Sequence, residues 1–90
     1  MTFKDNGLKI TVVLPSLKPT QKLVSTVTGL IEEGFSDIIV VNDGSSSDYD
    51  KVFSEVSSLE QCTLLKHDVN KGKGAALKTA FQYIQQQDKD

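Results

Sequence analysis

The sequence predicts an α/β domain in which three short parallel strands form a sheet with helices packed on both faces. Segments rich in β-branched and other apolar residues alternate along the chain with segments whose apolar residues recur at helical spacing. The strand-like segments are apolar almost throughout, as is typical of parallel strands buried between helices. We therefore expect a three-layer α-β-α architecture with the sheet in the middle.

Three segments are expected to form the strands. Residues 9–14 (KITVVL) are rich in β-branched side chains and end at Pro15, which cannot donate a hydrogen bond to a ladder. Residues 37–42 (DIIVVN) and 62–66 (CTLLK) have the same character. Because each crossover between parallel strands returns the chain to the same edge, the loops after the three strands should face the same way.

The segments between and after these strands have helical periodicity. Residues 20–33 form the first predicted helix, since apolar residues recur every three or four positions and Gly34 follows as a stop. Residues 49–56 carry a second apolar stripe. A third helix is predicted from about residue 74 to residue 87, and the polar end of the chain is expected to be a frayed tail.

Composition limits the functions that this chain could have. Its 90 residues, 38% hydrophobic and 24% charged, indicate one small soluble domain. A net charge of −2 gives no electrostatic reason to expect nucleic acid or an anionic membrane as a partner. The N-terminus does not resemble a secretory signal, and the single Cys62 cannot form an internal disulfide. A cytoplasmic location is expected.

A polar cluster follows the second predicted strand, where open α/β sheets bind their ligands. Asp43 could accept paired hydrogen bonds from a base or a sugar, and Gly44 allows the backbone to turn sharply beside it. The alternative is an Asx turn, in which Asp43 satisfies only the N–H groups of Gly44 and Ser45. The serines at 45–47 could orient phosphate or ribose hydroxyls, although caps and turns are the more common role of such a run.

A second polar cluster, NKGKG at residues 70–74, lies directly before the third predicted helix. Its two glycines allow close backbone approach, its two lysines are cationic donors, and a helix N-terminus adds unpaired N–H groups, a combination that suits a diphosphate. The alternative is an ordinary solvated loop. His67 has neither a second histidine nor a suitably spaced carboxylate pair, so we expect a surface or loop-bonding imidazole and no metal site.

Together these segments resemble the opening of family 2 glycosyltransferases. VVLP, IIVVNDGSSSD and HDVNKGKGAALKTAF occur in the order and at the intervals of the family forms VVIPxYNE, IIVVDDGSTD and NxGKGAAxxxG. The resemblance covers Ile10 to Phe81, and the lysine-glycine loop most resembles the branch that glycosylates dolichyl or polyprenyl phosphate. It implies the Rossmann-like half of a GT-A domain, with the three parallel strands in the order 3-2-1.

The resemblance also implies what the chain binds. The family moves a sugar from a UDP- or GDP-linked donor to an acceptor, usually with inversion, while Mg²⁺ or Mn²⁺ neutralises the departing diphosphate. Pro15 and its neighbours would wall one side of the base, Asp43 would accept a hydrogen bond from it, and Lys71 would lie in the loop that closes over the nucleotide. The implied nucleotide-binding residues are Pro15, Asp43, Gly44, Ser45, Lys71 and Gly72.

The resemblance further implies that residues 1–90 are a single truncated domain. The family's metal-binding D-x-D motif and its catalytic base follow the third helix, so we expect neither a catalytic nor a metal-binding residue in this chain, which should be inactive alone. The sequence DKD at 88–90 spells D-x-D but lacks a preceding apolar strand, and we interpret it as part of the tail. At Leu17, Lys18 and Pro19 the chain also lacks the tyrosine, asparagine and glutamate usual in the family.

Two further expectations complete the sequence-based account. Without the family's fourth strand, residues 10–14 would form an unpaired edge, which favours self-association through this strand. The alternative to a glycosyltransferase fragment is a non-catalytic α/β protein-interaction module in which both polar clusters are ordinary turns.

Overall fold

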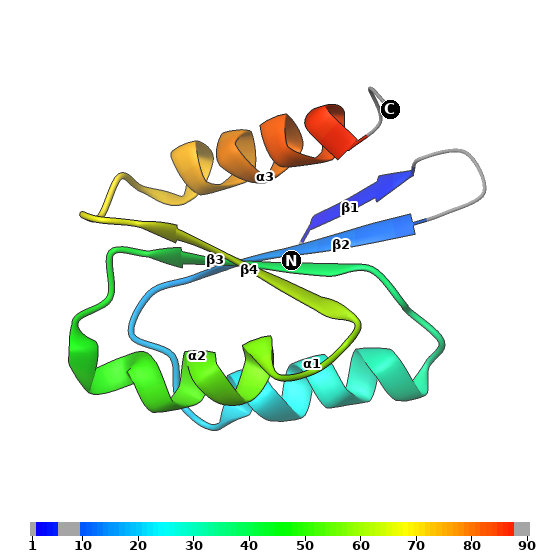
Figure 1. The fold of residues 1–90 in the computed structure, drawn as a ribbon, viewed down its shortest axis with the longest axis horizontal. Helices are drawn as coiled ribbons and strands as arrows, with labels where there is room; N and C mark the ends of the chain where they lie inside the picture. The colour runs from blue at the N-terminus through cyan, green and yellow to red at the C-terminus, as the bar shows by residue number, and fades with distance from the viewer. Residues whose placement is uncertain (1, 6–9, 88–90) are drawn as a thin grey trace.

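The computed structural model describes residues 2–5 and 10–87 and has a twisted sheet with helices on both faces (Figure 1). Helix α3 covers one face, and α1 and α2 cover the other. The elements in chain order are β1 (Thr2–Asp5), β2 (Ile10–Ser16), α1 (Lys22–Glu32), β3 (Ile38–Asp43), the 3-10 turn η1 (Ser47–Tyr49), α2 (Asp50–Ser57), β4 (Cys62–His67) and α3 (Lys73–Gln87).

The prediction of an all-parallel, three-stranded sheet in the order 3-2-1 is wrong. The sheet has four strands in the order β1-β2-β3-β4, and β1 runs antiparallel to β2, with Thr2 opposite Val13 and Asp5 opposite Ile10. A strand edge presents a row of backbone N–H and C=O groups that need partners, and β1 supplies them to β2. The premise of self-association through residues 10–14 is therefore also wrong, because this strand has a neighbour on each side.

The three predicted helices and the three parallel strands are present, with shifted ends. Strand β2 continues through Pro15 to Ser16, two residues further than predicted. Pairing with β1 reaches only Val13, so Pro15 lies where β2 has β3 as its one sheet neighbour. This extension matters because it carries β2 to the same level as the polar end of β3, where Ser16 is the register partner of Asn42.

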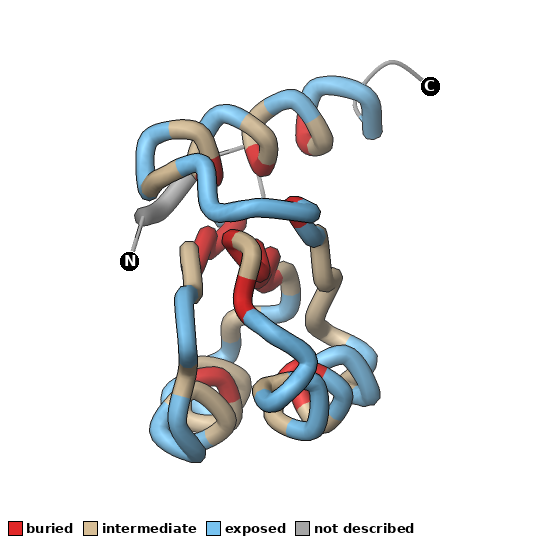
Figure 2. The backbone as a smooth tube through the Cα atoms, turned by 90° about the vertical axis from the view of Figure 1, so that its left-hand side faces the viewer, coloured by how far each residue is buried: buried red, intermediate tan, exposed pale blue. Residues whose placement is uncertain are grey.

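Strand β3 is the centre of the core, and each of its six residues is buried. Its side chains alternate between the two faces: Ile38 and Val40 pack toward α1 and α2, whereas Ile39 and Val41 pack toward α3. Figure 2 shows this buried centre between the helical layers. The same alternation directs the next odd-numbered residue, Asp43, to the α3 side of the sheet.

Two sequence-based expectations concern the ends of the chain and membranes. The interpretation of residues 88–90 as a polar tail lies outside the described residues. Within residues 2–5 and 10–87, each helix falls short of the length and apolar character that crossing a bilayer requires.

Candidate functional site

The loops after β2, β3 and β4 meet at one end of the sheet. They leave the parallel strands at the left of Figure 1, because the carboxyl ends of parallel strands share one edge of a sheet. The backbone N–H of Gly72 donates to Oδ2 of Asp43 over 3.0 Å. The two polar clusters identified in the sequence are therefore in direct contact, as the parallel arrangement predicts.

Asp43 is buried and holds the lysine-glycine loop in place. Its Oδ1 accepts a hydrogen bond of 2.9 Å from the backbone N–H of Lys71 and lies 2.8 Å from Nδ1 of His67, while Oδ2 accepts from Gly72. The Lys71 N–H contributes most to a pKa of Asp43 below its ordinary value, followed by His67, against the opposing effect of burial. Asp43 is therefore ionised at neutral pH, and nitrogen donors of the protein take the place of water around its carboxylate.

The turn after β3 is made by a different residue from the one that the sequence suggested. Oδ1 of Asn42 accepts a 2.9 Å hydrogen bond from the backbone N–H of Ser45, so the proposed Asx turn on Asp43 is wrong. The hydroxyl of Ser45 in turn accepts a 2.9 Å hydrogen bond from the backbone N–H of Lys18, whose φ of 51° is left-handed. Ser45 thus ties the loop after β2 to the loop after β3.

Gly44 is required by close backbone packing as well as by its left-handed φ of +78°. A Cβ atom at this position would lie 2.2 Å from the backbone nitrogen of Asn70 and 2.4 Å from the carbonyl carbon of Val69. The loops after β3 and β4 therefore touch through their main chains, and only glycine leaves room for the contact.

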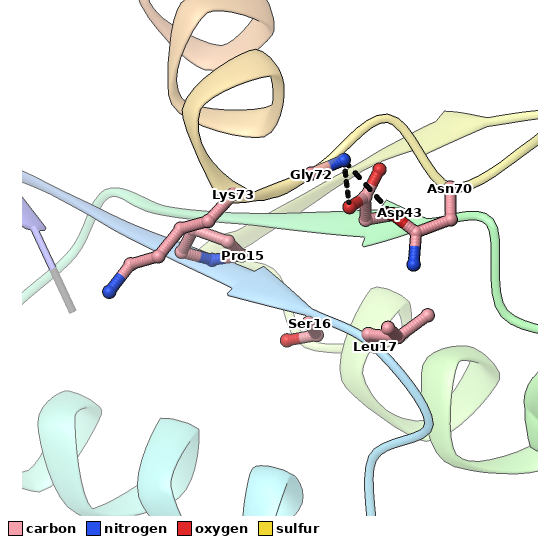
Figure 3. Close-up of a pocket in the computed structure, with 7 residues that line it drawn as sticks. All are labelled: Pro15, Ser16, Leu17, Asp43, Asn70, Gly72 and Lys73. Atoms are coloured by element: carbon pink, nitrogen blue, oxygen red, sulfur yellow. Dashed lines mark hydrogen bonds between the residues drawn. The ribbon is translucent and has the colours of Figure 1, made fainter.

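An open cavity of about 370 Å³ lies where these loops meet (Figure 3). Three of the six predicted nucleotide-binding residues, Pro15, Asp43 and Gly72, line it. The remaining three surround it indirectly: Gly44 and Ser45 hold the loops together, and Lys71 donates its backbone N–H to Asp43. The sequence-based assignment of the site omitted four further lining residues, which are Ser16, Leu17, Asn70 and Lys73.

In Figure 3 the side chain of Lys73 extends past Pro15 and away from Asp43, and Asn70 lies above Leu17. Lys73 is the first residue of α3, so its ammonium group and the helix N-terminus both make this side of the cavity electropositive. Oδ1 of Asn70 accepts a second hydrogen bond of 2.9 Å from the N–H of Gly72, which Asn70 and Asp43 therefore share. The cavity combines one cationic wall, one buried carboxylate and one apolar wall.

His67, expected to be a surface or loop-bonding imidazole, is buried behind the cavity and 6% exposed. Nδ1 faces Asp43, and Nε2 lies 2.8 Å from Oγ1 of Thr79 on α3. Strand alternation could have indicated this position, because His67 follows Leu65, which packs on the α3 side, by two residues. No comparable pattern marks Thr79, since its role depends on how α3 docks.

The described residues around the cavity do not provide a set of ligands for a divalent cation. Across the described ranges, no group of three or more His, Cys, Asp and Glu side chains lies together as metal ligands would. Asp43, the carboxylate of the cavity, already faces three nitrogen donors. No chemical step is therefore assigned to a metal on these residues.

The chain has an open α/β sheet with a polar cavity among the loops at its strand ends, which is where sheets of this class bind their ligands. The glycosyl transferase family 2 model matches residues 11–87. The chain belongs to this family, which confirms the resemblance to family 2 glycosyltransferases noted in its sequence.

Among curated proteins, the chain is similar to Uncharacterized protein MJ1222 of Methanocaldococcus jannaschii, with 35% identity over 77 residues. The match covers 86% of this chain and 30% of that protein, so the chain spans less than a third of its relative's length. No solved structure matches the chain.

Proposed function

We propose that this chain is the donor-binding part of a glycosyltransferase and that its cavity holds the nucleoside diphosphate of a UDP- or GDP-linked sugar. The observation that carries this proposal is the placement of Asp43, Gly72 and Lys73 around one cavity at the strand ends of a family 2 domain. The reaction class follows from the family, whose members transfer glycosyl groups.

Asp43 has capacity to bind a ligand even though it holds the loop. A carboxylate offers about four acceptor positions on its two oxygens. The N–H of Lys71 and the His67 ring occupy both acceptor positions of Oδ1, whereas among the described residues only Gly72 donates to Oδ2. The vacant position on Oδ2 supports a hydrogen bond from a ring N–H of uracil or guanine, while Pro15 and Leu17 offer apolar contact to the base.

Lys73 and the start of α3 provide the complementary charge for the diphosphate. Lys73 and Gly72 both line the cavity, and Gly72 has a left-handed φ of +93°. A lysine beside a helix N-terminus is a suitable arrangement for phosphate oxygens.

The remaining components of the reaction are proposed to come from elsewhere in the family domain. Mg²⁺ or Mn²⁺ would neutralise the leaving diphosphate there, and a base would activate the acceptor for displacement with inversion at the anomeric carbon. This chain alone would bind the donor without turning it over. The similarity of its NKGKG loop to the dolichyl and polyprenyl phosphate branch supports a lipid phosphate as acceptor.

Calorimetric titration with UDP, GDP and their sugars tests the proposal. Replacing Lys73 by alanine should weaken binding by about tenfold through loss of one charge-assisted contact. Lys78→Ala is the matched control, because Lys78 is exposed one to two turns further along the same helix and does not line the cavity. Equal affinities of the two variants, or no saturable binding at millimolar ligand, would contradict the proposal and favour a non-catalytic interaction module.

A further inference from the structure

Two side-chain hydrogen bonds connect Asp43, which lines the cavity, through His67 to Thr79 on α3. Thr79 on α3 lies 2.8 Å from Nε2 of His67, and Nδ1 of His67 lies 2.8 Å from Oδ1 of Asp43. His67 and Asp43 are 6% and 4% exposed, so both groups are withdrawn from solvent. Only Asp43 reaches the cavity; His67 and Thr79 stand behind it.

For a neutral His67 imidazole, the chemistry of these groups determines the direction of the hydrogen bonds. An ionised carboxylate only accepts, so the proton of the neutral imidazole must lie on Nδ1. Nε2 is then an acceptor, and the hydroxyl of Thr79 donates to it. A threonine hydroxyl can donate or accept, so Thr79 is compatible with the tautomer that the carboxylate requires.

The hydrogen bonds from Thr79 through His67 to Asp43 determine which oxygen of Asp43 is available to a ligand. With His67 and the Lys71 N–H both on Oδ1, that oxygen has no acceptor position left, and the vacant one belongs to Oδ2. The terminal torsion of an aspartate is broad and roughly two-fold, so it needs such partners to hold one orientation. Without the imidazole, Oδ1 would keep a buried acceptor position that the carboxylate could satisfy by turning.

We propose that His67, held by Thr79, is a positioning residue of the nucleotide site that orients Asp43 so that Oδ2 receives an N–H group of the base. This inference rests on the proposed function, since it assigns the specificity of the same cavity. His67 does not touch the ligand; it acts through Asp43. The base class it fits is one with a ring N–H next to a carbonyl, as in uracil and guanine.

Affinity measurements on four variants test this role. His67→Leu should weaken UDP and GDP binding by about tenfold, and Thr79→Val, which removes only the hydroxyl, by about threefold. His67→Asn retains an N–H donor near the Nδ1 position and should recover most of the affinity. Val56→Ala is the control: it leaves a cavity in the core on the opposite face of the sheet, which lowers stability, and it should leave affinity unchanged.

A measurement without nucleotide separates this inference from the proposed function. Nitrogen NMR of the His67 ring should show a protonated Nδ1 and an unprotonated Nε2. His67→Leu should shift the amide signals of Lys71 and Gly72. If the wild-type chain binds no nucleotide, the proposed function fails and the ligand part of the inference fails with it, while these signals still support the positioning of Asp43. If the wild-type chain binds and His67→Leu binds equally well, or if the proton lies on Nε2, this inference alone is overturned.

Discussion

Nδ1 of His67 lies 2.8 Å from Oδ1 of Asp43, and the two residues are register partners at the ends of adjacent parallel strands. Because Asp43 also accepts from the N–H groups of Lys71 and Gly72, the loop that leaves β4 is anchored to β3. The cavity wall formed by this loop therefore depends on one buried carboxylate.

Asp43→Asn should lower the free energy of unfolding by about 2–3 kcal/mol, because an amide replaces an acceptor that three donors face. Chemical denaturation measures the change. Asp68→Asn in the same loop is the control, since Asp68 is exposed and should tolerate the change with little effect. Equal stability of the Asp43 and Asp68 variants would contradict the anchoring role.

Acidification should reveal the lowered pKa of Asp43. Protons bind this carboxyl more readily in the unfolded chain, so its contribution is complete above the unfolded pKa of about 4 and is lost as the pH falls through the lower folded value. The stability difference between wild type and Asp43→Asn should therefore be constant near neutral pH and shrink below about pH 4. Denaturation at a series of pH values tests this, and a difference that grows on acidification would refute it.

Gly44→Ala should destabilise the chain by about 2–4 kcal/mol, because its Cβ would meet the backbone of Asn70 and its φ is left-handed. Gly29→Ala is the matched control. Gly29 lies within α1 with open space around it, so alanine there should stabilise by about 0.5–1 kcal/mol. Thermal unfolding of both variants should show shifts of opposite sign.

Ser45→Ala should release the loop after β2 at a cost of about 1 kcal/mol, since the N–H of Lys18 loses its acceptor. Faster hydrogen exchange of the Lys18 amide would report the loss directly. Ser46→Ala, at an exposed neighbouring serine, should leave that exchange rate unchanged. Unaltered protection of Lys18 in Ser45→Ala would show that another group holds the loop.

The elements that the sequence predicted correctly are those with strong periodic patterns. The apolar runs of β2, β3 and β4 and the stripes of α1 and α3 each have one physical solution, which is burial between a sheet and a helical layer. Strand β1 was missed because its four residues are too few for a periodic signal.

The location of the site was predictable from the sequence, but its hydrogen bonds were not. Parallel topology alone brings Asp43 and the NKGKG loop to one edge. That Asp43 holds the loop, that Asn42 makes the turn, and that His67 is buried all depend on distances between backbones remote in sequence. Residue type could not decide between an aspartate that binds a ligand and one that binds its own chain, and Asp43 has acceptor positions for both.

Chemical-shift mapping during titration with UDP and GDP tests the central claim most directly, because it locates the ligand. The account predicts saturable shifts concentrated at the amides of residues 16–17, 43 and 70–73, which surround the cavity. Shifts confined to α1 and α2, or none at millimolar nucleotide, would contradict it.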